Sequence, residues 1–455
     1  MKRKPSVLSL MSVTLLGAVL VASSCKKEAQ APVGGDDRYT SATIINPTNP
    51  TLSGVLGTGH NVKDTIRLKS PANGGLAWRL SGLVYVDSAD VLIIDAGTTI
   101  KGNLSTGTGI PGGGLVVCRG AKILADGTAA NPIIFTSANT GTSTAPKSGD
   151  WSGVIVLGNA SSNHSGRVQV EGVPSNPPAS ATFGGSTGTV DTDNSGILRH
   201  IRIEWAGFEL TPNNEINGLT FGGVGSGTTV DFVEVFKSRD DAFEWFGGTV
   251  NASHLISVDA LDDMFDTDNG FRGTITYALG LADTTRADLS TSNGFESDND
   301  ATGSTATPTT NVTYNYITIV GLPSAAKASI TNGQPSGSGT YGRSAHLRRR
   351  SQFAISNSIF LGYNRGLWRE GLGSGTVASS FVHAYTAGEA YVNITPTGSQ
   401  DYSGQADPNA SIVLTSPFDR SAIANFEPDA LFSPATAAGA FANGQWATGG
   451  FVKLR

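Results

Sequence analysis

The stretch "GLVVCRGAKILADGTAANPIIFTSA", from Gly114 to Ala138, decides the fold, together with the earlier "VLIIDAGTTIKGN", from Val91 to Asn103. Both stretches alternate apolar strands of about three to five residues with corners that contain glycine. The spacing is too short for hairpins of full strands and too regular for an ordinary loop. A chain that turns this often without helices can stack each coil on the previous one, with parallel strands ~4.8 Å apart. We therefore predict an all-β solenoid.

An internal repeat supports the solenoid independently. The repeated segments are "DDAFEWFGG" (240–248), "DDMFDTDNG" (262–270) and "NGFESDND" (293–300). The second begins 22 residues after the first, and periods of 20–50 residues are typical of stacked units. In this register Phe243, Phe265 and Phe295 are equivalent, and we predict that they stack inside the coil, because aromatic rings fill such an interior well. Their acidic neighbours should line the outside, since side chains alternate along a strand.

Several segments resemble the pectin-lyase-like right-handed β-helix superfamily, most closely its bacterial secreted lipoproteins. The segments that carry the resemblance are "AGTTIKG" (96–102), "GAKILADGTAANPIIFTS" (120–137), "GDWSGVIVLGNA" (149–160), "NNEINGLTFGGVGSGTTVDFVEV" (213–235) and "DDAFEWFGGTVNASHL" (240–255). The resemblance implies a right-handed parallel β-helix. The strand and turn pattern places this β-helix, with its irregular loops, at residues 51–394, and the less regular residues 395–455 are predicted to be a C-terminal cap. This scaffold carries lyases, hydrolases, adhesins and plain binding proteins, so the fold alone does not identify the function.

The N-terminal sequence predicts a lipid anchor. Residues 1–24 begin with three basic residues and continue with an apolar stretch that is too short for a confident membrane span. Three small residues then precede Cys25, which resembles a lipoprotein acylation site; an ordinary signal peptide with a chance cysteine is the alternative. Residues 25–50 are predicted to be a lipidated tether. Because Lys26 and not aspartate follows Cys25, we expect attachment to the outer membrane of a cell envelope.

Composition and charge exclude some partners. The chain has 455 residues, with 58 Gly, only 15% charged residues and a formal net charge of −6. That balance argues against nucleic acid, which needs a strongly basic surface. Cys118 is the sole cysteine of the predicted mature body, so it cannot form an internal disulfide, and we expect it to be a small buried hydrophobe.

The strongest chemical signal is a concentration of acids. Between positions 231 and 300 there are 15 acidic and four basic residues. Carboxylates on adjacent coils repel each other, and calcium, which prefers six to eight oxygen ligands, is a natural counterion. The predicted metal ligands are Asp240, Asp241, Glu244, Asp262, Asp263, Asp266, Asp268, Glu296 and Asp298. The alternatives are a solvated acidic surface with turn-capping Asp and Asn residues, or catalytic carboxylates.

A basic cluster follows the acids along the chain. It contains Arg343, His346, Arg348, Arg349, Arg350, Arg365 and Arg369. Strand alternation would put Arg348 and Arg350 on one side and Arg349 on the other. The planar guanidinium suits carboxylate and sulfate groups. The predicted ligand-binding residues are Arg348, Arg350, Arg365, Trp368 and Arg369, with Trp368 stacking on a sugar ring. The alternative is that these arginines pair with the acidic residues of the same chain.

Alternation in "RHIRIEWAG" (199–207) predicts that Trp205 belongs to the core. No nucleotide-binding loop, serine-hydrolase elbow or paired-histidine metal motif is present. The sequence therefore favours an envelope lipoprotein whose β-helix binds an extracellular polysaccharide with calcium. A polysaccharide lyase or hydrolase that acts on an anionic glycan, and an adhesion or envelope-assembly component, are the alternatives.

Overall fold

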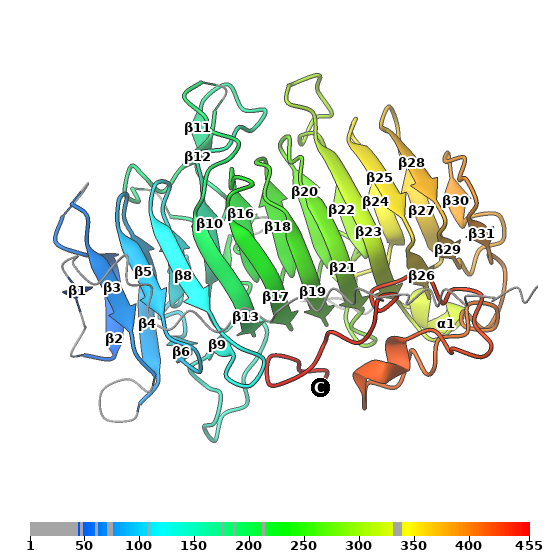
Figure 1. Ribbon diagram of the computed structural model, residues 1–455, viewed down its shortest axis with the longest axis horizontal. Helices are drawn as coiled ribbons and strands as arrows, with labels where there is room; N and C mark the ends of the chain where they lie inside the picture. The colour runs from blue at the N-terminus through cyan, green and yellow to red at the C-terminus, as the bar shows by residue number, and fades with distance from the viewer. Residues whose placement is uncertain are drawn as a thin grey trace, which may run out of the picture. The chain divides into compact units, whose positions relative to one another are not determined.

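The computed structural model describes residues 44–45, 49–59, 62–70, 76–107, 109–174, 176–185, 187–211, 214–330 and 339–455. Parallel strands stack coil upon coil and form three faces of a right-handed β-helix, which confirms the predicted fold class (Figure 1). Face 1 contains β7 (Gly114–Val117), β10 (Gly153–Leu157), β16 (Leu219–Gly222), β18 (Phe243–Phe246), β20 (Phe265–Asp268), β22 (Phe295–Ser297), β24 (Arg343–Leu347), β27 (Arg365–Arg369) and β30 (Tyr391–Val392).

The other two faces share several long strands that bend at one corner. Face 2 contains β1 (Ile44–Ile45), β3 (Thr65–Leu68), β5 (Val91–Ile94), β8 (Lys122–Asp126), β25 (Gln352–Ser356) and β28 (Ser374–Ala378). Face 3 contains β6 (Thr99–Gly102), β9 (Ile133–Ser137), β26 (Ile359–Leu361), β29 (Phe381–Val382) and β31 (Gln400–Asp401). The bent strands that run through both are β13 (Gly196–Glu204), β17 (Thr229–Phe236), β19 (Ala252–Val258), β21 (Thr274–Leu281) and β23 (Asn311–Val320). Near the N-terminal end, β2 (Thr51–Leu56) and β4 (Trp78–Val86) join faces 3 and 1 instead.

In the bent strands, one residue in the left-handed conformation makes the corner between faces 2 and 3. His200, Phe232, His254, Tyr277 and Tyr316 occupy it on successive coils, with φ between 48° and 57°. Their rings stack outside the corner, with centroids 4.3–5.2 Å apart. Since each ring covers its neighbour, the stack offsets part of the backbone strain that a non-glycine residue has at positive φ.

The predicted phenylalanine ladder fills the interior. Phe243 pairs in register with Phe265, and Phe265 with Phe295. Both ring-to-ring distances are 5.5 Å, and all three side chains are fully buried. This confirms the register between the repeats, and it fixes which side chains of the same strands point outward.

The prediction that Trp205 belongs to the core is wrong. Strand β13 ends at Glu204, and Trp205 has a φ of 66°, so strand alternation no longer applies to it. Its half-buried ring lies outside the coil, 5.3 Å from the ring of Phe236 and 5.4 Å from the ammonium group of Lys237.

Short elements decorate the coil. They are the hairpin strands β11 (Arg167–Val168) and β12 (Phe183–Gly184), the pair β14 (Glu209–Thr211) and β15 (Asn214–Glu215), the helix α1 (Ala325–Ala328) and the 3₁₀ helix η3 (Ile423–Phe426). Among the described residues no helix is both long enough and apolar enough to cross a membrane.

The C-terminal segment runs back along the outside of face 3 (Figure 1). Its Ile412, Leu414, Phe426 and Phe451 pack on apolar side chains that point outward from that face, such as Ile256. Near the end of the chain, the Lys453 amide donates to the buried Glu234 carboxylate at 2.8–2.9 Å. This segment covers the apolar outer side of face 3, whereas the acidic repeats lie on face 1.

Candidate functional site

The turns that lead into face 1 carry a ladder of Asp and Asn side chains. Asp241 accepts the backbone N–H of Asp263 at 2.8 Å, and Asp263 accepts that of Asn293 at 2.5 Å. Asn293 in turn accepts the backbone N–H of Arg343 at 3.0 Å. Short polar side chains readily take such backbone partners, which is why the repeats begin with Asp or Asn. The ladder aligns successive coils and brings two carboxylates into one buried column.

Strand register places further carboxylates on the outside of face 1. Glu244 pairs with Asp266, and Asp266 with Glu296. Two residues further along the same strands, the outward positions belong to Phe246, Asp268 and Asp298, the residue that follows Ser297. The predicted acidic column is therefore a contiguous feature of the fold.

Five of the predicted ligands form two overlapping triads. Carboxylate oxygens of Asp240, Asp241 and Asp262 lie within 4.8 Å of one another, as do those of Asp241, Glu244 and Asp266. Asp241 belongs to both triads. Three carboxylates at this separation are the hard oxygen ligands that calcium accepts, and they leave further coordination positions for water or a ligand.

Two residues that the sequence did not single out complete this cluster. The Asn217 amide contacts the Glu244 carboxylate and lies 3.5 Å from Glu171. Asn217 is fully buried, and its Oδ1 has no hydrogen-bond partner among the described residues. An unpaired buried carbonyl oxygen costs free energy, so this atom is a ready additional oxygen ligand. The segment "INGLTFGG" (216–223) resembles the acidic repeats, and this similarity could have identified Asn217 from the sequence. Glu171 belongs to an insertion that does not resemble the repeats.

The cluster resists ionisation. Burial raises the pKa of Asp240, Asp241, Glu244, Asp262 and Asp266 well above the ordinary carboxyl value, and neighbouring carboxylates raise it further. Burial, and then Asp298, raise the pKa of Asp268 to about 7. None of the five forms an ion pair with a Lys or Arg of the described residues, and one oxygen each of Asp262 and Asp266 is buried without a partner. The cluster therefore lacks the positive charge that would keep it ionised.

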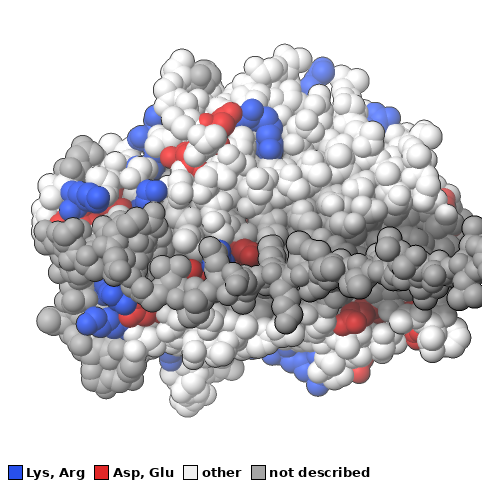
Figure 2. All heavy atoms as spheres, in the orientation of Figure 1, with Lys and Arg blue, Asp and Glu red and all other residues white. Residues whose placement is uncertain are grey.

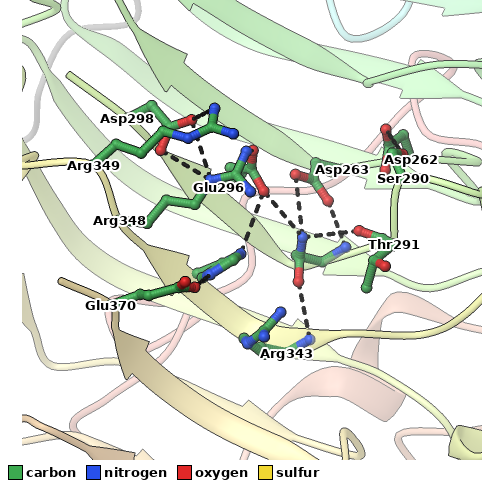
Figure 3. Close-up of polar contacts among 12 residues, drawn as sticks. Asp262, Asp263, Ser290, Thr291, Glu296, Asp298, Arg343, Arg348, Arg349 and Glu370 are labelled. Atoms are coloured by element: carbon green, nitrogen blue, oxygen red, sulfur yellow. Dashed lines mark hydrogen bonds and ion pairs between the residues drawn. The ribbon is translucent and has the colours of Figure 1, made fainter. Parts of the chain in front are cut away.

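The C-terminal end of the column is neutralised by arginine. Arg348 pairs with Glu296 and, at 3.0 Å, with Asp298, while Arg349 pairs with Asp298 at 2.7 Å (Figure 3). His346 lies 2.5 Å from Glu370 and 3.5 Å from Glu296. The nine predicted metal ligands thus divide into a part without cations around Asp241 and a part already paired, with Asp263 and Asp268 in between.

The predicted alternation of the three consecutive arginines is wrong. Strand β24 ends at Leu347, and Arg349 and Arg350 adopt positive φ in a turn, because the chain leaves face 1 there. Arg350 donates to the Gly303 carbonyl at 2.8 Å, and Arg369 donates to backbone carbonyls, including that of Asn393. Arg348 and Arg349 therefore follow the alternative interpretation of the sequence, in which the arginines pair with acidic residues of the same chain.

Trp368 lies on face 1, next to His346 in register. The guanidinium carbons of Arg343 and Arg365 lie 4.4 and 4.2 Å from its ring centroid. Arg365 also pairs with Glu389 at 2.5 Å. The ring is therefore held by two cations, a different arrangement from the open sugar platform that the sequence suggested.

The concentration of acids is local. The side of the molecule in Figure 2 carries small mixed groups of acidic and basic side chains separated by uncharged surface. Cys118 is fully buried, as predicted, and burial raises its thiol pKa to about 12. Cys25 and the leader lie outside the described residues.

Comparison with known proteins gives one match. A family model described as "Pectate-lyase like beta helix domain" covers residues 27–416, which confirms the predicted β-helix superfamily. Neither the curated proteins nor the solved structures include a significant match.

Proposed function

Because the chain belongs to the pectate-lyase-like beta-helix domain family, we propose that it binds a polysaccharide along face 1, through calcium held at Asp240, Asp241, Glu244, Asp262 and Asp266. The single observation that carries the proposal is the pair of triads that share Asp241. Their carboxylates have no cationic side chain to pair with among the described residues, unlike Glu296 and Asp298 a few strands away.

Electrostatics explains why the two ends of the column differ. Two carboxylate oxygens 4.8 Å apart repel by ~0.9 kcal/mol in water and ~3.5 kcal/mol at an effective dielectric constant of 20. Arg348 and Arg349 neutralise one end, and no Lys or Arg within the described part of the chain pairs with the other end. A calcium ion at the Asp241 end would offset the repulsion. Its remaining coordination positions would accept hydroxyl or carboxylate oxygens of a sugar chain.

We propose further that the body is displayed from the cell envelope. The support is the sequence before residue 39, in which small residues precede Cys25 and a polar tether follows it. Two or more acyl chains on the cysteine would anchor the protein stably. Detergent-phase partitioning of the full chain tests this: the parent should enter the detergent phase and Cys25→Ser should remain in the aqueous phase. Equal partitioning of the two would exclude the anchor.

The binding proposal is tested with immobilised acidic and neutral polysaccharides and the full chain, in calcium and in a chelator. The informative variant is Asp241→Asn, which retains the oxygen that accepts the Asp263 amide but removes the charge common to both triads. Asp401→Asn is the matched control, because Asp401 also accepts a backbone N–H, from Ser403 at 2.8 Å, but lies exposed in β31.

We expect binding that needs calcium, is lost in Asp241→Asn and persists in Asp401→Asn. Binding of equal strength in the chelator, or in Asp241→Asn, would refute the role of the acidic cluster. The same samples are monitored in the ultraviolet, where unsaturated products absorb, so that a lyase is distinguished from a binding protein.

A further inference from the structure

A second feature of face 1 is a cavity beside the first residues of β24 and β27. Its volume is about 430 Å³, and its lining includes Thr291, Tyr341, Arg343, Asn364, Arg365 and Thr386. Of the residues that the structure describes, no carboxylate lines it, whereas hydroxyl, amide and guanidinium groups do. A hollow with this lining offers hydrogen-bond donors and positive charge to whatever enters it.

Arg343 is the unusual member of this lining. The guanidinium forms no hydrogen bond and no ion pair with the described residues, and its Nε is buried without a partner. The hydrogen bonds of Arg343 are made by its backbone: its N–H donates to the Asn293 side chain at 3.0 Å, and its carbonyl accepts the N–H of Gly294 at 3.0 Å. A guanidinium whose Nε–H is buried without an acceptor is costly, because that donor has lost its water partner and gained none in the protein.

The neighbouring acids are already committed elsewhere. Glu296 pairs with Arg348, and Glu370 with His346. Glu389 pairs with Arg365, which stands next to Arg343 in register. Of the two guanidiniums around Trp368, only that of Arg365 forms an ion pair, with Glu389.

The position of the guanidinium is fixed before any ligand arrives. The Trp368 ring centroid lies 4.4 Å from the Arg343 guanidinium carbon and 4.2 Å from that of Arg365. Such cation–π contacts hold the charges in place but leave the edge of the guanidinium, with its N–H groups, without acceptors. That edge is the part of arginine that recognises carboxylate and sulfate groups.

The larger hollow near Lys237 and Arg420 does not offer these two residues as unpaired cations. Although its volume is about 650 Å³, both of these cations pair with Asp259. The cationic groups of Lys237 and Arg420 are therefore already paired within the chain.

We propose that the Arg343 cavity is an anion site that takes the carboxylate or sulfate group of an acidic sugar. The anion accepts hydrogen bonds from the Arg343 guanidinium, and the polar lining contacts the sugar hydroxyls. Arg365 and Trp368 are positioning residues that hold Arg343 in place. The inference deepens the proposed function, since β27 lies three strand steps, ~14 Å, from β20 on the same face. One glycan chain can therefore reach both the acidic cluster and the cavity.

Calorimetric titration of the full chain in a chelator tests the site, with glucuronate, inorganic sulfate and neutral glucose as probes. Arg343→Gln removes the charge, and Arg67→Gln, whose arginine pairs with Asp95 on face 2, is the matched control. A charge-assisted hydrogen bond corresponds to an affinity change of about tenfold to a hundredfold. We expect glucuronate or sulfate to bind the parent and Arg67→Gln alike, to lose at least about tenfold in Arg343→Gln, and glucose to bind neither.

Binding of only one of the two anions identifies the group that the site prefers and supports the proposal. Absence of binding of both anions to the parent overturns it, as does equal affinity in the parent and Arg343→Gln. Arg343→Met, which keeps the apolar stem, replaces Arg343→Gln should that variant not fold. The chelator removes calcium, so this binding is measured without any contribution from the acidic cluster's proposed metal. Failure of the calcium proposal is thereby separated from failure of this one.

Discussion

Replacing Asp241 with asparagine should change the stability of the protein in opposite directions with and without calcium. Asp241 is the carboxylate common to both triads, and its oxygens lie within 4.8 Å of those of four other acids. Asparagine keeps the acceptor for the Asp263 amide, so the ladder of backbone contacts survives. In the absence of metal the substitution removes the repulsion that Asp241 has with its four neighbours when it is ionised.

The magnitude follows from Coulomb's law and the size of the chain. A single carboxylate pair at this distance costs ~0.9 kcal/mol at water's dielectric constant, and protonation of neighbouring groups limits the total to about 1–3 kcal/mol. Unfolding entropy of ~2.1 cal/mol/K per residue over roughly 400 residues gives ~0.8 kcal/mol per kelvin. Asp241→Asn should therefore raise the Tm by about 1–4 °C in a chelator.

Calcium should reverse this order. At a concentration 100 times the Kd, a single bound ion stabilises the parent by ~2.7 kcal/mol, or about 3 °C. Asp241→Asn loses a ligand from each triad and should gain little. The assay is scanning calorimetry at pH 7 of the parent, Asp241→Asn and the Asp401→Asn control, in a chelator and in calcium. A lower Tm for Asp241→Asn in the chelator, together with an undiminished calcium response, would refute the reasoning.

Three more results are expected. The cluster carboxylates have folded-state pKa values above their unfolded values, so the folded protein binds more protons than the unfolded chain, and the metal-free stability should fall as the pH rises from about 4 to about 7, the pKa of Asp268. With calcium, the curve of stability against pH should flatten. A rise in stability over that interval in the chelator would contradict this. Phe265→Ala should cost about 3–5 kcal/mol in urea unfolding, since it removes the central ring of the ladder, and a loss below about 1 kcal/mol would show that the ring is not packed. Arg348→Gln should lower the free energy of unfolding by about 1.5–3 kcal/mol at pH 7, because it leaves Asp298, which is only 5% exposed, with Arg349 alone. This loss should shrink at pH 4, and equal losses at both pH values would argue against the ion pairs.

The fold was predictable because the repeat is local in sequence and its spacing is regular. Phe243, Phe265 and Phe295 recur with the same acidic neighbours, so the alternation of one strand fixes both the interior and the outer column. Alternation fails where a strand ends. Trp205 and Arg349 both sit at left-handed corners, where a single residue at positive φ redirects the chain, and no local pattern marks those positions.

The site was predictable only in part. The acids of the repeats were identified, but the sequence could not show that Arg348 and Arg349 neutralise Glu296 and Asp298, since these pairs join residues about 50 positions apart. Nor could it show that Glu171 reaches the cluster, because this residue belongs to a long insertion. Arg343 resembled its neighbours in the basic cluster, and only the structure reveals that no acid of the described ranges forms an ion pair with it.

Long-wavelength anomalous diffraction from crystals grown in calcium chloride tests the central claim most directly. Calcium bound as inferred gives an anomalous peak among Asp240, Asp241, Glu244, Asp262 and Asp266, with carboxylate oxygens at 2.3–2.6 Å, the usual Ca–O distance. A map that has no peak there, while the carboxylates remain within 4.8 Å of one another and hydrogen-bonded through retained protons, would contradict it.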